Sequence, residues 1–496
     1  MKKLLSLLLS MTMLLTAFSS CGESEENADV QTPVPTANES PEPAAEAGPE
    51  TTIYESALAS LPGETYGGRS FTILTRGAEL FEMDAEELIG EMTNDAVYNR
   101  NRLAEQTCDI VITAEDAGMW DDVTNKMKAS VTAGDYLYNL IGQVDFKTYA
   151  VVGAGLCGNW LDIPVISFDA PWWTKAANDE ATINGILYTF TGDFCVTNIL
   201  YGNVLFYNAP LCENYGITAS SLQDMVFEKN WTFDRFDSLL SGIYEDSNGN
   251  TQKDAEDLYG IALSPDGHCD EWLTAFAQPL TAVSEDGVIE VVMFTDKTVT
   301  ALGKVLSLYY ENIGTYNPGS WQTAATYELF VADRALFTSG ILNDARTTFA
   351  GMESDFGVLP YPMWDEAQES YYTVASDQFS VIAFPINTPE EDYGFLGTVT
   401  ELLGILSKRD VVPAFYDSAL KNRYSMDENT AKIIDLIMDG RLFEFSFQYG
   451  NDIEIPYMFR NQIIGNSPDI MSAWQKKEKV VNKTLGRIAK YYGLEG

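Results

Sequence analysis

Three short apolar runs decide the fold: Phe71-Thr-Ile-Leu-Thr75, Asp109-Ile-Val-Ile-Thr113 and Tyr138-Asn-Leu-Ile-Gly142. Each run has the length and the apolar, partly β-branched composition that is typical of a buried strand. Residues 88–103 and 120–132 lie between these runs and place their apolar side chains at helical spacing. The resulting β-α-β-α-β order predicts an α/β lobe with a largely parallel sheet.

The rest of the chain continues the alternation of strands and helices. Residues 204–208, 259–263, 356–359 and 379–384 are further predicted strands, and long helical patterns follow them. The chain has 496 residues, of which 46% are hydrophobic, and this allows two or three lobes with a large core. We find no internal repeat.

The net charge excludes several classes of partner. The chain has 30 Lys and Arg against 73 Asp and Glu, which gives a formal charge of −43. Nucleic-acid binding depends mainly on Lys and Arg that neutralise phosphates, and docking onto anionic lipid depends on the same residues. We therefore expect no nucleic-acid partner and no binding to membranes by charge.

The single histidine, His268, excludes several kinds of catalytic site. A zinc site with three histidines and an HExxH motif are both impossible, and a Ser-His-Asp site could be built only around His268. A GxGxxG match at residues 153–158 is not followed by a helical pattern, so the sequence does not predict dinucleotide binding. We expect no catalytic cofactor.

The N-terminal residues are typical of an export and anchoring signal. Two lysines, an apolar run of 14 residues and small residues before Cys21 predict a signal peptide over residues 1–20. Cys21 after two serines is similar to a bacterial lipobox, in which the cysteine is lipidated. Residues 22–50 carry eight acidic residues, five prolines and no basic residue, so residues 21–65 are expected to form a disordered tether. The five later cysteines show no CxxC spacing and are expected to be buried free thiols.

Six segments of the predicted folded part carry a resemblance when they are considered together and in order. "AGDYLYNLI", "INGILYTFTGD", "LFYNAPLCENYGI", "KNWTFDRF", "RALFTSG" and "DFGVLPYPMWDEAQESYYT" occur in this order between about residues 69 and 491. Together they resemble the extracellular solute-binding proteins of carbohydrate ABC importers, the group that includes maltose-binding proteins.

This resemblance implies a fold and a mode of action. The fold is the two-lobed, periplasmic-binding-protein-like α/β fold of type II, with lobes joined by crossing hinge strands. The first lobe would comprise residues 66–200 and 360–440, and the second lobe residues 207–357 and 450–496, with crossings near 200–208, 356–360 and 442–453. A sugar or oligosaccharide would bind between the lobes, and hinge closure would present it to the permease of an ABC transporter. The protein would act outside the cytoplasm as a monomer, held at the membrane only by the lipid on Cys21.

The candidate ligand-binding residues are those that suit a sugar. Hydroxyl pairs need carboxylates, amides or arginine, and the apolar face of a sugar needs an aromatic ring. Loops that follow strands, and turns near the expected cleft, contain the following candidates: Arg76, Gln143, Asp145, Trp172, Trp173, Asp193, Tyr201, Trp272, Trp321 and Asp377. Of the adjacent pair Trp172 and Trp173, one is expected in the cleft and the other in the core.

A polar loop in the second lobe resembles an EF-hand calcium loop. Oxygen-bearing residues occur at the spacing that can surround a hard cation, with ligands at Asp246, Asn248, Asn250, Gln252, Asp254 and Asp257. Thr251 replaces the usual glycine at position 6, and position 12 is an aspartate. A surface turn that is held by its own hydrogen bonds is the alternative.

The competing functional hypothesis is a secreted carbohydrate-active enzyme. A glycoside hydrolase needs only two carboxylates, and a chain with 73 acidic residues can supply them. The order of the family strings favours a binding protein that is not an enzyme.

Overall fold

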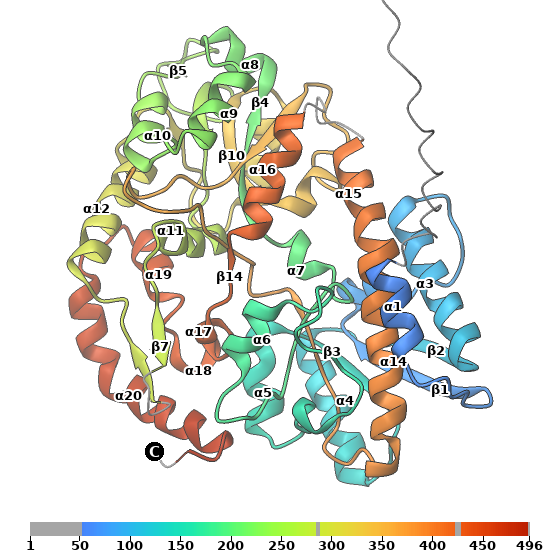
Figure 1. Ribbon diagram of the computed structural model, residues 1–496. Coiled ribbons are helices and arrows are strands. Elements are labelled where there is room, and N and C mark those ends of the chain that lie inside the picture. The colour runs from blue at the N-terminus through green and yellow to red at the C-terminus, as the bar shows by residue number, and fades with distance from the viewer. Residues whose placement is uncertain (1–51, 284–287, 422–427, 495–496) are drawn as a thin grey trace, which may run out of the picture. The chain divides into compact units, whose positions relative to one another are not determined.

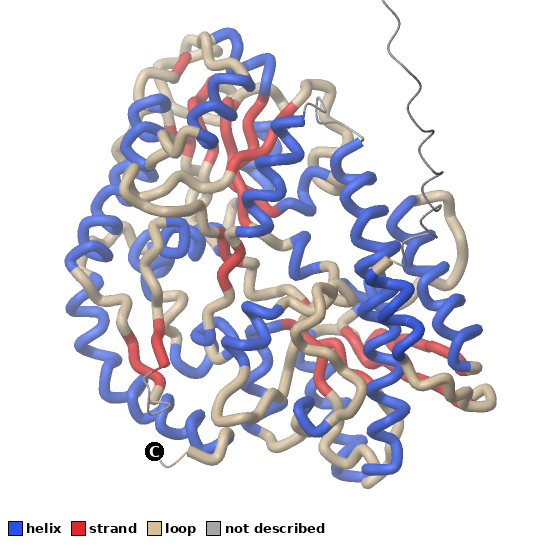
Figure 2. The backbone as a smooth tube through the Cα atoms, viewed as in Figure 1, coloured by secondary structure: helices blue, strands red, loops and turns tan. Residues whose placement is uncertain are grey.

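The computed structural model describes residues 52–283, 288–421 and 428–494 (Figure 1). The predicted signal peptide, Cys21 and the tether up to residue 51 lie outside these residues. In the described part of the chain, no helix combines the length and apolar character that a membrane span requires. Residues 52–494 form one compact unit with two sheets that lie apart from each other (Figure 2).

The first lobe, residues 52–202 and 375–421, is built on a four-stranded sheet. Its order is β13 (Ser380–Ala383), β3 (Leu140–Val144), β1 (Arg69–Thr75) and β2 (Ile110–Asp116), and only the β13–β3 pair is antiparallel. The three apolar runs of the sequence therefore correspond to the neighbouring parallel strands β3, β1 and β2. The helices of this lobe are α1 (Ile53–Ser60), α2 (Leu80–Met83), α3 (Met92–Cys108), α4 (Trp120–Ala133), α5 (Thr148–Gly153), α6 (Lys175–Ala181), α7 (Thr197–Leu200), α14 (Tyr393–Leu406) and α15 (Val412–Lys421).

The second lobe, residues 203–374 and 428–494, surrounds a mixed sheet. Its order is β11 (Phe356–Leu359), β4 (Asn203–Asn208), β10 (Ala335–Ile341), β6 (Leu258–Ala262) and β5 (Tyr244–Glu245), and β9 (Thr315–Tyr316) also pairs with β6. β7 (Thr281–Val283) and β8 (Ile289–Val291) form a separate antiparallel pair. The helices are α8 (Ala209–Asn214), α9 (Ala219–Phe227), α10 (Phe233–Leu240), α11 (Glu271–Ala275), α12 (Asp296–Tyr310), α13 (Thr323–Val331), α16 (Glu428–Asp439), α17 (Phe445–Gln448), α18 (Gly450–Ile453), α19 (Met458–Ile464) and α20 (Ile470–Tyr491).

In the described part of the chain, two connections between the lobes lie side by side, at residues 201–203 and 374–376. The chain leaves the first lobe at Tyr201 and Gly202, and it returns beside the same point, because the Ser376 N–H donates to the Tyr201 carbonyl at 2.8 Å. β12 (Thr373–Val374) pairs in parallel with β14 (Arg441–Leu442), and β14 lies between the two sheets in Figure 1. The expected two-lobed α/β architecture with crossing strands is thus confirmed.

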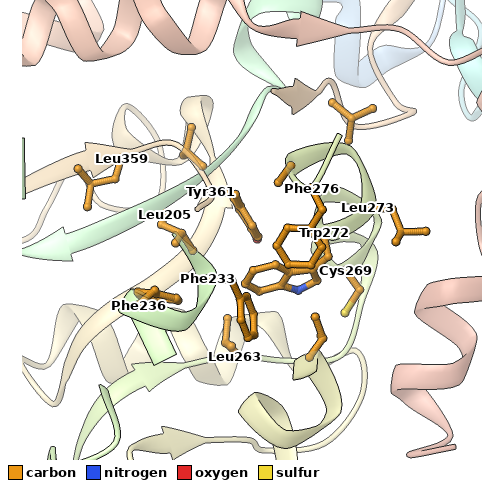
Figure 3. Close-up of a cluster of buried hydrophobic side chains, with 14 of the residues drawn as sticks. Leu205, Phe233, Phe236, Leu263, Cys269, Trp272, Leu273, Phe276, Leu359 and Tyr361 are labelled. Atoms are coloured by element: carbon orange, nitrogen blue, oxygen red, sulfur yellow. The ribbon is translucent and has the colours of Figure 1, made fainter. Parts of the chain in front are cut away.

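Each sheet has its own hydrophobic core. In the second lobe the indole of Trp272 is fully buried and meets Phe233 and Tyr361 edge to face, with ring centroids 5.4 and 4.8 Å apart (Figure 3). The cysteines at 108, 157, 195, 212 and 269 are buried free thiols, as expected.

Three boundaries differ from the expectation. Residues 53–60 form α1 instead of tether, because Thr52 and Glu55 make a capping box and Tyr54 and Leu58 pack against the first core. Residues 360–374 belong to the second lobe, so the return crossing lies at 374–376 and not at 356–360. α16 also belongs to the second lobe, since Ile433, Ile434 and Ile437 are buried in its core. The crossing expected at 442–453 is therefore wrong, because the chain already belongs to the second lobe at α16.

Candidate functional site: the cleft between the lobes

A cavity of about 320 Å³ lies between the two lobes, next to the hinge. This volume is at the lower end of the range of small-molecule sites. Residues of the first lobe and the return crossing line one side: Trp120, Phe146, Val374, Ala375, Ser376, Asp377 and Gln378. Residues of the second lobe line the other side: Asn203, Gly267, Asp270, Trp321, Phe447, Asn451, Tyr457 and Arg460. A bound molecule would therefore contact both lobes.

Arg460 is the central cation of the cleft. Its guanidinium forms an ion pair with Asp270 at 2.6 Å, and both side chains are nearly buried. The same guanidinium lies over the rings of Tyr457 and Trp321, with its Cζ 4.4 and 5.4 Å from the ring centroids. α19 thus positions an arginine between two aromatic rings, and a carboxylate from the segment before α11 neutralises it.

A second carboxylate, Asp377, lies on the opposite side of the cleft. The Tyr457 hydroxyl donates to Asp377 Oδ2 at 2.8 Å, which links the second lobe to the return crossing. The Asp377 carbonyl accepts from the Phe146 N–H at 3.0 Å and fixes the loop after β3. Burial raises the pKa of Asp377, although Tyr457 and Arg460 act in the opposite direction.

A third carboxylate, Asp145, lies behind the lining. Burial, and after it the neighbouring Asp377, raises the pKa of Asp145 well above its ordinary value. Asp145 Oδ1 and Asp270 Oδ1 are buried and accept no hydrogen bond from any residue in the described ranges. The cleft therefore concentrates carboxylate groups that are only partly satisfied by the protein.

The first lobe supplies aromatic rings at the start of α4 and after β3. Trp120 and Phe146 meet edge to face, with ring centroids 5.3 Å apart. Gln143 at the end of β3 donates to the Trp120 carbonyl at 3.1 Å, and Arg76 lies over the Trp120 ring at 5.3 Å. Gln143 and Arg76 therefore hold the Trp120 platform in place.

Trp321 supplies an aromatic surface from the second lobe. Trp321 is 60% exposed, whereas the other aromatic rings that line the cavity are buried or half-buried. Its backbone lies in the left-handed region with φ +58°, which is uncommon for a bulky residue, and its N–H donates to the Pro265 carbonyl at 3.2 Å. A strained backbone that holds an indole toward open space is a feature typical of ligand sites.

The structure brings some of the candidate residues together. Trp321 and Asp377 line the cleft. Arg76 and Gln143 lie directly behind it and contact Trp120, and Asp145 is buried close enough to Asp377 for its pKa to be raised by that carboxylate. Tyr201 lies at the hinge, where its carbonyl accepts from Ser376.

Four candidates lie elsewhere, which corrects the expectation. Trp172 and Trp173 are both in the first core, and their indole N–H groups donate to the two oxygens of Glu401 at 3.1 and 2.8 Å. Trp272 is in the second core (Figure 3), and Asp193 forms an ion pair with Lys408 at 3.1 Å. None of these four residues lines the cavity.

Sequence reasoning missed the most polar part of the cleft. Asp270 is two residues from His268, whose ring nitrogens face Asn203 and Tyr327, so the motif "DGHCDEW" contained a site residue beside a structural histidine. Tyr457 and Arg460 lie in a helical segment near the C-terminus that follows no strand, and no local pattern indicates them. Trp120 begins the helix after β2, a position that the rule for strand ends could have found.

The loop at residues 246–257 is held by its own hydrogen bonds. Both Asp246 oxygens accept backbone N–H groups, from Gly249 at 2.7 Å and from Thr251 at 2.8 Å. Asp254 accepts from the side chains of Asn248 and Asn250, Asn250 accepts from the Gln252 N–H, and Asp257 accepts from the Tyr244 hydroxyl. Within the described ranges, no group of three or more Asp, Glu, His or Cys side chains is arranged to hold a metal ion. This is the arrangement of the alternative that the sequence left open, a surface turn of the Asx type.

Comparisons with known proteins find similarity at the level of the fold and not at the level of the sequence. No protein-family model matches the sequence, and no curated protein sequence matches it. Solved structures do match. The cyclic α-maltosyl-1,6-maltose binding protein of Arthrobacter globiformis aligns with 85% of this chain and 100% of its own, at 14% identity and a TM-score of 0.56.

Two other solved structures give the same result. UgpB from Mycobacterium tuberculosis in complex with glycerophosphocholine covers 85% of this chain and 99% of its own, at 13% identity and a TM-score of 0.55. The galacto-N-biose-/lacto-N-biose I-binding protein of the ABC transporter from Bifidobacterium longum covers 87% and 99%, at 15% identity and a TM-score of 0.52. The protein has the two-lobed fold of these solute-binding proteins, and at this identity its ligand has to be argued from its own cleft.

Proposed function

We propose that this protein is the substrate-binding component of an ABC importer and that it captures a sugar or oligosaccharide between its lobes. The observation that carries the proposal is the composition of the cleft, in which the Arg460–Asp270 pair and Asp377 lie among the rings of Trp120, Trp321 and Tyr457. Carboxylates and arginine bind hydroxyl pairs, and aromatic rings cover the apolar face of a sugar. The solved structures of similar fold include proteins in complex with oligosaccharides, which supports the same choice.

The mechanism follows from the position of the cleft. A ligand that contacts Trp120 and Asp377 on one side and Trp321 and Arg460 on the other gains its full set of contacts only when the lobes are close together. It therefore binds the closed state more tightly than the open state and shifts the population toward closure. The crossings at 201–203 and 374–376, beside which β12 pairs with β14, are proposed as the hinge.

The closed protein is proposed to deliver its ligand to the membrane permease of the importer. The protein is proposed to be a bacterial lipoprotein that acts as a monomer outside the cytoplasm, with the signal peptide removed and lipid attached to Cys21. The support is the sequence before Cys21, together with the fold, which similar binding proteins of ABC transporters share. Replacement of Cys21 by Ser is expected to release the protein from membranes into the medium, and retention of the variant would contradict lipid anchoring.

The enzyme hypothesis is less well supported. A glycoside hydrolase needs a general acid and a nucleophile or base, which are two carboxyl groups on either side of the scissile bond. In this cleft Asp270 is paired with Arg460, and Asp377 accepts the Tyr457 hydroxyl. These contacts hold the carboxylates for recognition.

One experiment separates the two functions. The purified protein is incubated with a panel of mono- and oligosaccharides, and both its melting temperature and the integrity of each sugar are followed. A binding protein is stabilised by about 2.7 kcal/mol at a ligand concentration of 100 Kd and leaves the sugar intact. Cleaved products would establish an enzyme, and the absence of any shift across the panel would overturn the sugar assignment.

We also propose that the loop at residues 246–257 binds calcium as a structural element of the second lobe. The donor set consists of the oxygen groups that calcium prefers. The backbone at Thr251 lies in the left-handed region, with φ +62°, where calcium loops usually carry glycine. Calcium there would add rigidity beside β6 and play no part in sugar binding.

A further inference from the structure

Acidic groups outnumber basic groups around the cleft, and this excess indicates the charge of the ligand. Each cation near the cavity has an acidic partner of its own. Arg460 pairs with Asp270, Arg76 pairs with Glu79, and Lys147 pairs with Asp121. Among the described residues, Asp377 and Asp145 form no ion pair, and the guanidinium of Arg460 lowers the pKa of Asp377 only from a longer distance.

The two remaining carboxylates act on each other. Asp377 is one of the two perturbing influences on Asp145, and it raises the pKa of Asp145 in the same direction as burial does. Two desolvated carboxylates that lie close enough for one to raise the pKa of the other are unfavourable together unless a proton or a cation lies beside them. The protein holds Asp377 in the cleft lining by the Tyr457 hydroxyl and by the Phe146 N–H, so it is fixed in a place that a ligand can reach.

The surroundings of Asp377 suit a cation. Phe146 and Phe447 line the cavity together with Trp120 and Trp321. The faces of such rings attract cations, and the rings of Tyr457 and Trp321 already have one beside them in the guanidinium of Arg460. The formal charge of −43 on the whole chain adds a field that draws cations in and keeps anions out.

We propose that the ligand carries a protonated amine, as an amino sugar or its oligomers do, and that Asp377, with Asp145 behind it, receives the ammonium group. This inference rests on the proposed function for the sugar and adds the charge of the ligand. Neutral sugars use the same cleft with lower affinity, and sugars with carboxylate or phosphate groups are excluded.

Binding is measured by calorimetry in mildly acidic buffer with four probes. They are a glucosamine tetramer, the same tetramer fully N-acetylated, a galacturonic acid tetramer and spermidine. The glucosamine tetramer is expected to bind at least tenfold more tightly than the acetylated one, and the galacturonic acid tetramer is expected not to bind. Equal or tighter binding of the acetylated tetramer overturns the inference.

Two variants locate the effect. Asp377→Asn keeps an oxygen that accepts the Tyr457 hydroxyl and removes the charge, so it is expected to weaken the glucosamine tetramer at least tenfold and the acetylated tetramer less than twofold. Asp234→Asn removes the same unit of charge from the surface of α10, where Asp234 pairs with Lys304, and is expected to change neither. Equal losses in both variants, or equal losses for both sugars in Asp377→Asn, overturn the inference. The melting temperature of each variant verifies that it is folded.

The outcomes also separate this inference from the sugar function. If neutral sugars bind and no amine binds better, the sugar function stands and the inference fails. If spermidine binds in an Asp377-dependent manner and no sugar binds, the cation site stands and the sugar function fails. If neither the glucosamine tetramer nor spermidine binds, the inference is overturned.

Discussion

Trp272 and Trp321 belong to the same lobe and have opposite environments. The Trp272 side chain is fully buried in the core, and the Trp321 side chain is 60% exposed at the edge of the cleft. Trp321→Ala is expected to lower ligand affinity by about 1–2 kcal/mol, or roughly five- to thirtyfold, because it removes an aromatic face. The free energy of unfolding should change little, since few contacts are lost. Calorimetric titration and urea unfolding measure the two quantities.

Trp272→Ala is the matched control. It removes a buried indole and is expected to destabilise the protein by about 3–5 kcal/mol, with normal affinity in whatever fraction remains folded. A Trp321→Ala variant that unfolds as easily as Trp272→Ala, or binds ligand like the unaltered protein, would contradict the assignment of Trp321 to the site.

Glu82 gives a pH-dependent prediction. This side chain is fully buried, and burial raises its pKa to about 8, while the Thr197 N–H and hydroxyl donate to it. A carboxyl whose pKa is higher in the folded than in the unfolded chain stabilises the fold below the unfolded pKa of about 4.3. This stability is lost as the pH rises through the folded pKa. The free energy of unfolding should therefore fall between about pH 4 and about pH 8.

Glu82→Gln tests this expectation. The amide does not titrate and can still contact Thr197, so urea unfolding over the same pH range should give a flatter curve than the unaltered protein gives. Glu87→Gln, a change at an exposed glutamate in the same region, should leave the slope as it was. Parallel curves for the unaltered protein and Glu82→Gln would show that Glu82 does not titrate in this range.

Helix α1 is an element whose contribution can be measured directly. Tyr54, Leu58 and Leu61 pack against the first core, next to α14. A chain that begins at residue 62 is expected to melt several degrees below one that begins at residue 52, because it exposes this apolar surface. Thr52→Ala removes only the capping box and should cost about 1 kcal/mol. Equal melting temperatures for the two truncated chains would make α1 dispensable.

The loop at residues 246–257 provides a second prediction at the level of an element. If it binds calcium, a chelator should lower the melting temperature of the unaltered protein, and added calcium should restore it. Asp246→Ala should melt at a lower temperature with or without chelator, because Asp246 also accepts the N–H groups of Gly249 and Thr251. A chelator effect of the same size in both proteins would place the calcium elsewhere.

Closure is a property of the whole molecule. Because the cleft is lined from both lobes and the connection is short, a ligand is expected to reduce the radius of gyration in small-angle X-ray scattering. The change should saturate with the same midpoint as the calorimetric titration. Binding without compaction would indicate a rigid cleft and would leave delivery by closure without support.

The sequence was sufficient for the architecture of each lobe, because strand and helix periods are local properties. The period of Phe71 and Ile73 and the crossover helix after them define the first sheet without further information. The predicted return crossing at 356–360 is wrong because β12, the strand beside the observed crossing, has only two residues and leaves almost no periodic signal. The sequence predicts Trp272 and one of Trp172 and Trp173 in the cleft, because a sequence pattern does not distinguish a tryptophan in a core from one that faces a ligand.

The residues at the centre of the cleft could not be predicted from the sequence for a related reason. Asp270, Asp377 and Arg460 come from three distant segments. The packing of α19 against the segment before α11 joins Asp270 and Arg460, and the Tyr457 hydroxyl links Asp377 to them. A rule that searches the ends of strands finds part of the first-lobe side of the cleft. It cannot find side chains from a helix that no strand precedes.

Because α1 packs on the first lobe, a lipid on Cys21 would be attached to the protein through that lobe. About 30 residues separate Cys21 from Thr52, and an extended chain of that length spans at most about 100 Å. A protein confined to a hemisphere of that radius has an effective concentration on the order of 1 mM at the membrane surface. Encounters with a permease in the same patch of membrane would then be frequent even if the two proteins attract each other weakly. The lipid anchor would be joined to the first lobe only, so the second lobe could move about the hinge without a change in the position of the anchor.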